Sequence, residues 1–338
     1  MKIRIQTENY EKERLSKFAS LSADSKGRQE FEEQSEIRTV FQRDRDRIIH
    51  SKAFRRLKHK TQVFLAPEGD HFRTRLTHTL EVSQIGRTLA NALRLNEDLV
   101  EAIALGHDLG HTPFGHTGER VLNGLHSNGF SHNKQSIRIV DILEQNKDKK
   151  GLNLTYEVRE GIIKHSGNNL SNTLEGQVVG MADRIAYINH DIDDAIRGNI
   201  INGQDLPKDC IGILGKTHSN RINTMIIDVI KNSMDKDYIT MSREIDEITN
   251  KLRDFMFENV YYNETAKSED NKAEYIITEL YNYYLKNSKS LPIEYQKEYK
   301  GYKSSIEDRI CDYIAGMTDR YAVNTFSRIF IPKPWKIY

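Results

Sequence analysis

The chain has 338 residues, enough for one large domain or for one domain with an appendage. Its 29% charged and 37% hydrophobic residues are typical of a soluble protein, and a net charge of +1 gives no general attraction to nucleic acid or acidic membranes. Two cysteines, Cys210 and Cys311, without a C-x-x-C spacing, argue against a disulfide scaffold or a zinc ribbon. No apolar signal segment and no run of ~18 apolar residues occurs, so we expect a cytoplasmic protein without membrane association.

The N-terminal part of the chain is polar and then basic. Residues 1–35 predict short helices and a loop, with a break at residues 25–28, and residues 37–60 predict a helix. Basic residues are concentrated between Arg38 and Arg75. Two interpretations remain open for them, a solvated helix face or a pocket for a polyanion.

Two helices follow, and each places one histidine on its apolar side. Apolar residues recur at helical spacing from Arg73 to Leu95, and His78 lies on that stripe. Asn96 is predicted to cap the next helix, because its side-chain oxygen can accept hydrogen bonds from the free amides of the first turn. This second helix carries His107 on its apolar face, and the regular spacing ends at Pro113.

The remaining spacing predicts further helices and almost no strand. They are expected over residues 135–146, 156–165, 174–197, about 220–233, 241–260, 271–286 and 304–319. Asp183 falls on the apolar side of the 174–197 helix, and the polar stretch 263–271 is predicted to be a loop. We therefore expect an all-α fold and a single domain over residues 1–338, with a metal-binding core at about 70–200 and a helical C-terminal part at about 201–338.

One short stretch, Leu105 to His116, contains three histidines and an aspartate among small residues. Neutral imidazoles and carboxylates are the ligands that a divalent cation takes in hydrolases. His107 and Asp108 are adjacent and cannot form a site alone, but His78 and Asp183 each lie on the inward side of another predicted helix. We therefore predict a site for one divalent cation made of these four residues. The alternative is that each histidine is an ordinary buried residue with a satisfied hydrogen bond.

His111 and His116 lie on either side of Pro113, on a predicted loop or short turn. Glu119 lies three residues after His116. A carboxylate bonded to an imidazole fixes the tautomer of the ring and raises its basicity, as in a general acid or base. The alternative is a surface ion pair.

A second row of polar groups runs along the 174–197 helix. Asp183, Tyr187 and Asp191 are spaced four residues apart and are therefore neighbours on one helix surface. The row is either a solvated stripe or a series of contacts leading from the metal to a sugar hydroxyl.

Six segments together resemble one family, the bacterial deoxyguanosine triphosphate triphosphohydrolases of the HD-domain phosphohydrolases. His78, His107, Asp108 and Asp183 match the H…HD…D pattern that names the HD domain. The resemblance covers about residues 20 to 330. Its segments are Arg47–His50, Phe54–Leu57, Lys60–Val63, Arg75–Val82, His107–Glu119 and Asp312–Tyr321.

The resemblance implies hydrolysis of a deoxynucleoside triphosphate (dNTP), dGTP or others, to the deoxynucleoside and inorganic triphosphate. One divalent cation (Mn, Mg, Fe, Co, Ni or Zn) would be held by the four residues of the H…HD…D pattern. His116 with Glu119 would be the acid/base assembly, and His111 and His132 would be active-site histidines that contact the phosphates.

The resemblance also implies residues that bind the substrate. Those near the sugar would be Gln62, Val63, Tyr187 and Asp191, with Asp191 at the 3′-hydroxyl. Those near the phosphates would be Arg75, Arg184 and Arg55. Because relatives are commonly homo-oligomers, some activated by a second dNTP and some able to bind DNA, we expect a homo-oligomer and include an allosteric dNTP and single-stranded DNA among the candidate partners.

Two other functions remain open. One is an HD phosphohydrolase acting on a different nucleotide, such as a monophosphate, a cyclic nucleotide or guanosine tetraphosphate. The other is a non-catalytic nucleotide sensor or single-stranded nucleic-acid binder. The presence of both His116 and Glu119 favours catalysis, since a sensor needs the ligands for the nucleotide and not an acid/base pair.

Overall fold

The computed structural model describes residues 3–62, 73–146, 149–167, 169–261, 264–299 and 302–333. Over these residues the chain is helical, which confirms the predicted all-α class. The strands found there are two residues each, β1 (Gln145–Asn146) and β2 (Lys149–Lys150), paired antiparallel. None of the helices in the described part combines the length and the apolar character needed to cross a bilayer.

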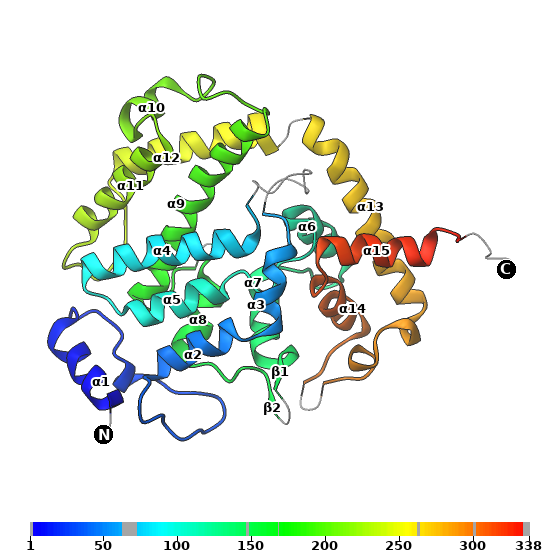
Figure 1. The fold of residues 1–338 in the computed structure, drawn as a ribbon, viewed down its shortest axis with the longest axis horizontal. Helices are drawn as coiled ribbons and strands as arrows, with labels where there is room; N and C mark the ends of the chain where they lie inside the picture. The colour runs from blue at the N-terminus through cyan, green and yellow to red at the C-terminus, as the bar shows by residue number, and fades with distance from the viewer. Residues whose placement is uncertain are drawn as a thin grey trace, which may run out of the picture.

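The helices are shown in Figure 1. Their bounds are α1 Ile3–Arg14, α2 Val40–Ile49, α3 Lys52–Arg56, α4 Arg75–Leu93, α5 Glu97–Gly106, α6 Gly115–Leu125, α7 His132–Arg138, α8 Tyr156–Lys164, α9 Leu174–Arg197, α10 Lys208–Leu214, α11 His218–Ser233, α12 Arg243–Met256, α13 Glu264–Lys286, α14 Ile306–Ala315 and α15 Asp319–Phe330. Short π-helical turns follow α7 and α12.

Several predicted boundaries are confirmed. The predicted 174–197 helix coincides with α9, and the predicted 73–95 helix is α4. Asn96 caps α5 as expected, because its side chain accepts a hydrogen bond from the backbone N–H of Leu99. The described side chains Arg43, Arg45 and Arg47 pair with carboxylates, so this part of the basic segment is neutralised within the protein.

Other boundaries were wrong, and caps explain most of them. The predicted 37–60 helix ends at Ile49, because Ser51 caps a new helix, α3, by accepting from the Phe54 N–H. The predicted 304–319 helix divides after Ala315, and Thr318 caps α15. His116, predicted on a loop or a short turn, lies in the first turn of α6.

The predicted loop at 263–271 was also wrong from Glu264 onward, where the backbone is the beginning of α13. The sequence there is polar, but it contains Glu, Ala and Lys, which are strong helix formers. The polar composition of this stretch therefore did not indicate an absence of helix.

The larger hydrophobic core surrounds α4, which packs along both α5 and α9. Val82 and Leu89 of α4, Leu99 of α5 and Ile185 of α9 are almost completely buried in it. Burying one such side chain contributes about 1.5–3 kcal/mol. The three helices that carry His78, His107 and Asp183 are thus fixed to one another by their apolar faces.

A second core joins α6 to the C-terminal helices α13, α14 and α15, which lie together on one side of the molecule (Figure 1). Leu122 of α6, Ile277 and Leu280 of α13 and Ile314 of α14 are fully buried in this core. Helix α6, whose first turn carries His116, therefore belongs to the second core.

Gly110 is required where the loop after α5 meets α7. A Cβ at this position would lie 2.2 Å from the Ser136 backbone nitrogen and 2.3 Å from the His132 carbonyl oxygen. We predict that Gly110→Ala lowers the free energy of unfolding by about 2–4 kcal/mol, because backbone atoms cannot move aside without displacing the helix.

The matched control is Gly124→Ala in α6, where a Cβ would meet no atom within 4 Å. Its unfolding free energy should be unchanged or higher by up to about 1 kcal/mol. Urea denaturation of both variants checks the prediction, and equal stabilities would contradict it.

Candidate metal centre

The side chains of His78, His107, Asp108 and Asp183 converge from three helices. His78 lies in the first turn of α4, His107 and Asp108 directly follow α5, and Asp183 lies in the middle of α9. His78, His107 and Asp108 are at most 3% exposed. The structure thus brings together all four residues of the predicted metal site, and their role as ligands stays a prediction.

The distances between the four side chains suit a shared cation. His78 Nε2 lies 3.0 Å from Asp183 Oδ1, and His107 Nε2 lies 3.4 Å from Asp108 Oδ1 and 3.9 Å from Asp183 Oδ1. Two ligands at right angles, each about 2.1 Å from a metal ion, are about 3 Å apart. Small side-chain movements would bring these atoms to that spacing.

His107 is prepared to act as a ligand. Its Nδ1 is 2.6 Å from the Ala104 carbonyl oxygen, which can only accept, so Nδ1 carries the proton and Nε2 has a free lone pair. Nε2 is buried and has no hydrogen-bond partner. A buried lone pair without a partner is unfavourable unless a cation binds it, and a backbone carbonyl behind the ring is the usual support of a metal-bound histidine.

Both carboxylates are held in the ionised form that a metal needs. Burial opposes ionisation of Asp183, but the hydrogen-bonded His78 and the nearby His107 lower the pKa of its carboxyl to about 2. Burial likewise opposes ionisation of Asp108, and its imidazole and guanidinium neighbours hold its pKa well below the usual range. Arg75 is the guanidinium concerned, with Nη1 2.8 Å from Asp108 Oδ2.

Arg75 therefore contacts the centre through Asp108. It is 1% exposed, and its Nε has no partner among the described groups. The predicted contact between Arg75 and the triphosphate would have to use this buried guanidinium.

The predicted acid/base residues form a second group beside the centre. Glu119 Oε1 lies 2.8 Å from His132 Nδ1, whereas Oε2 is 3.4 Å from Nδ1 of His116. The His116 side chain is 75% exposed, and the His111 ring lies between those of His116 and His132. The structure thus brings the predicted pair together at long hydrogen-bond distance, and it gives Glu119 a shorter bond to His132.

His165, which follows α8, is a member of the cluster that sequence reasoning missed. Its Nδ1 is 2.7 Å from the Ile162 carbonyl oxygen, and its Nε2 is 3.2 Å from His132 Nε2. Burial lowers the pKa of His165 to about 3, so the ring is neutral and its Nε2 accepts. The only sequence signal was a histidine at the end of a predicted helix.

His132 must then donate from both ring nitrogens, one to His165 and one to Glu119. Burial opposes this charge, but Glu119 raises the pKa of His132. Since both nitrogens are occupied, the predicted contact of His132 with phosphate would be through the charge of the ring and not through a free N–H.

The sugar-binding residues predicted on α9 lie on one side of the helix, as expected. Asp191 is buried, its Oδ2 accepts a hydrogen bond from the Tyr261 hydroxyl, and its Oδ1 has no partner among the described groups. Tyr187 is half-buried on the same row. Gln62 is buried beside Arg75, with its backbone oxygen 3.4 Å from Nη2, and Val63 falls outside the described residues.

Two predicted phosphate-binding residues lie apart from this cluster. Arg184 points to α12, where its Nη1 is 2.7 Å from Asp246 Oδ1 and its Nη2 is 3.0 Å from Asn250. Arg55 is an exposed residue of α3. No hydrogen bond or ion pair among the described residues joins either guanidinium to the four ligand side chains.

Comparisons with known proteins show the family of the chain. The HD domain family matches residues 75–188, and the family described as Phosphohydrolase-associated domain matches residues 239–328. A deoxyguanosinetriphosphate triphosphohydrolase-like protein of Caldanaerobacter subterraneus subsp. tengcongensis is 58% identical over 99% of this chain and 98% of its own. The chain belongs to this family.

A second relative of the same name, from Clostridium perfringens, is 50% identical over 98% of this chain and 99% of its own. A hypothetical protein of Aquifex aeolicus with a solved structure aligns over 85% of this chain and 71% of its own, with 20% identity and a TM-score of 0.47. The sequence relatives confirm the predicted resemblance to HD-domain hydrolases. The His and Asp cluster could hold the divalent cation that such domains bind.

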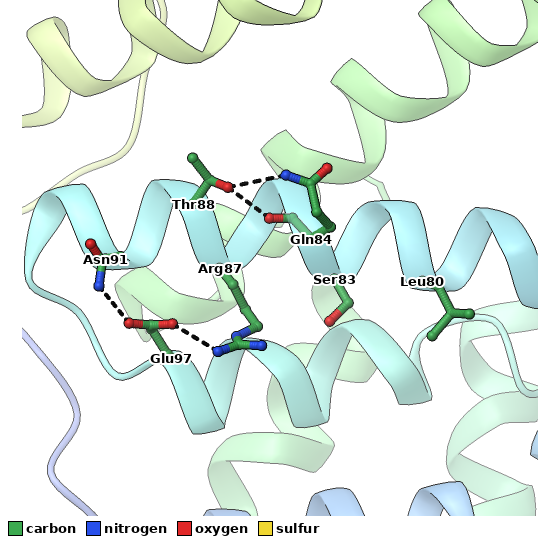
Figure 2. Close-up of a pocket in the computed structure, with 7 residues that line it drawn as sticks. All are labelled: Leu80, Ser83, Gln84, Arg87, Thr88, Asn91 and Glu97. Carbon is green, nitrogen blue, oxygen red and sulfur yellow. Dashed lines mark hydrogen bonds and ion pairs between the residues drawn. The ribbon is translucent and has the colours of Figure 1, made fainter.

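A shallow hollow of about 510 Å³ is lined by residues of α4 and by Glu97 at the start of α5 (Figure 2). Its polar side chains bind one another: Glu97 accepts from Arg87 and Asn91, and Gln84 donates to Thr88. The charged side chains that line the hollow, Arg87 and Glu97, pair with each other.

The buried carboxyl of Asp191 gives a testable pH dependence. Burial raises its pKa to about 7, whereas a carboxyl of the unfolded chain titrates near 3.9. Between about pH 4 and pH 7 the folded protein keeps a proton that the unfolded chain has lost, so this group's contribution to stability decreases as the pH rises.

Asp191→Asn removes this titration. We predict that the unfolding free energy of the variant, relative to the wild type, increases by roughly 1–3 kcal/mol from pH 5 to pH 8. Urea titrations at the two pH values measure it, with Asp235→Asn, a change of a side chain that is 69% exposed, as the control. A relative stability that stays constant or decreases with pH would refute the prediction.

Proposed function

We propose that the protein hydrolyses deoxynucleoside triphosphates, dGTP and others, to the deoxynucleoside and inorganic triphosphate. The observation that carries the proposal is the convergence of four ligand side chains, three of them buried and Asp183 partly buried, beside the exposed His116 and the histidines bound by Glu119. The names of the near-full-length relatives support a dNTP as the substrate.

In this proposal the reaction breaks the bond between the α-phosphorus and the 5′-oxygen and forms a bond from the α-phosphorus to the oxygen of water. Water adds to the α-phosphorus, the 5′-oxygen leaves as the hydroxyl of the deoxynucleoside, and the three phosphates remain together. A divalent cation held by His78, His107, Asp108 and Asp183 would supply Lewis-acid stabilisation of the negative charge on the phosphate.

The protein's own groups move the proton and hold the substrate. His116, an exposed residue in the otherwise buried first turn of α6, would transfer the proton while Glu119 orients its ring. The free Oδ1 of Asp191 would accept a hydrogen bond from the 3′-hydroxyl. The imidazolium of His132 would balance charge on the triphosphate.

The predicted homo-oligomer, the allosteric dNTP and the binding of single-stranded DNA stay predictions. The product analysis described below also tests the allosteric dNTP, because the assay is run with and without a second dNTP.

Product analysis tests the proposed reaction. Each of the four dNTPs and GTP is incubated with Mn²⁺ or Mg²⁺, with and without a second dNTP, and the products are separated by ion-exchange chromatography. We predict intact triphosphate and deoxynucleoside in equal amounts. Release of phosphate or diphosphate instead would favour another HD phosphohydrolase, and binding without turnover over hours would favour a sensor.

His116→Ala should retain the metal and lose about 10²–10⁴-fold in kcat, because only the proton transfer is removed. Arg120→Ala is the control, since Arg120 is an exposed residue of the same helix that pairs with Glu274. Metal content per chain is measured beside kcat. A loss of metal in His116→Ala would show that the role assigned to His116 is wrong.

A further inference from the structure

The corner between α14 and α15 contacts the loop that carries the histidines. Asp319, the first residue of α15, accepts hydrogen bonds on both carboxylate oxygens. Oδ1 lies 2.9 Å from the Phe114 backbone nitrogen, and Oδ2 lies 2.9 Å from the Thr61 backbone nitrogen and also accepts from the Thr61 hydroxyl. One carboxylate therefore joins two segments that are more than 50 residues apart in the sequence.

The Phe114 backbone has a conformation that local sequence does not favour. Its φ is 62° and its ψ is 26°, in the left-handed region that residues with a Cβ seldom adopt, and Gly115 follows with φ 57°. Helix α6 begins directly after this turn, so the turn sets the direction of His116 and Glu119. A hydrogen bond from the Phe114 N–H to a distant carboxylate can hold such a turn in place.

Lys60 binds the same loop from the other side of the corner. Its side chain is buried, and Nζ lies 2.5 Å from the His111 carbonyl oxygen and 2.7 Å from the Ala315 carbonyl oxygen at the end of α14. The His111–Phe114 turn is thus connected at both ends to residues 315–319, by Lys60 at His111 and by Asp319 at Phe114.

We propose that Asp319 is a positioning residue for the reaction, and that with Lys60 it makes the α14–α15 corner a support for the two segments that carry Gln62, His111 and His116. The inference rests on the proposed function. It assigns to the C-terminal helices a direct part in the geometry of the active site, in addition to their packing against α6.

The test compares three variants. Asp319→Ala removes both acceptors, and Asp319→Asn keeps the size of the side chain and one acceptor oxygen. Asp308→Asn is the matched control, because Asp308 is also half-buried, also lies in the first turn of a C-terminal helix, and contacts α6 at its far end through His126, with Oδ1 3.1 Å from Nε2.

We expect kcat to fall about 10–100-fold in Asp319→Ala, because a displacement of about 1 Å in catalytic groups costs that much, while metal content stays at the wild-type level. Asp319→Asn should be intermediate, and Asp308→Asn should keep kcat within threefold of the wild type. If the substitutions acted only by lowering stability, the melting temperature would fall in all three variants and their kcat values would not differ from one another.

Hydrogen exchange provides a readout that does not need activity. Amides of residues 111–118 should exchange faster in Asp319→Ala and at the wild-type rate in Asp308→Asn. If the wild type does not release triphosphate, the proposed function fails while the exchange result still shows whether Asp319 holds the turn. Wild-type exchange in Asp319→Ala, or a kcat within threefold of wild type, would overturn the inference.

Discussion

The structure depends on two carboxylates, the buried Asp108 and the partly buried Asp183, that lie beside the imidazoles of His78 and His107. Asp108 and Asp183 are kept ionised by their neighbours, and His107 presents an unpartnered Nε2 because the Ala104 carbonyl binds its other nitrogen. Taking such charges out of water is costly unless they are compensated. A divalent cation would compensate them, and the apolar faces of α4, α5 and α9 hold the ligands rigidly enough to select its position.

Other charged groups surround this centre. Arg75 donates a hydrogen bond to Asp108, and His132 donates one to Glu119 and one to the neutral His165. Only His116 of this group is largely exposed. The arrangement separates a buried charge-balancing part from the exposed ring of His116, the group proposed to transfer the proton.

The sequence was sufficient for those features that depend on local periodicity. The apolar stripes of α4, α5 and α9 predicted that His78, His107 and Asp183 face inward, and the structure brings them together. The cap of α5 at Asn96 was also predictable, because capping is a local hydrogen bond. By contrast the break at Ser51 was missed, since a serine within a helical pattern is ambiguous between an exposed position and a new cap.

Contacts between distant segments were not predictable from the pattern. His165 has no spacing that connects it to His132, Arg184 is bound by Asp246 of another helix, and Asp319 contacts a residue 258 positions away. These contacts are decided by how the packed helices meet, which a single sequence does not encode locally.

X-ray diffraction with anomalous scattering, from crystals of the wild-type protein soaked in Mn²⁺, tests directly whether the four side chains bind one cation. We predict one strong anomalous peak within about 2.3 Å of Nε2 of both His78 and His107 and of a carboxylate oxygen of Asp108 and of Asp183. A peak elsewhere, with His107 Nε2 bonded to a protein group, would contradict it.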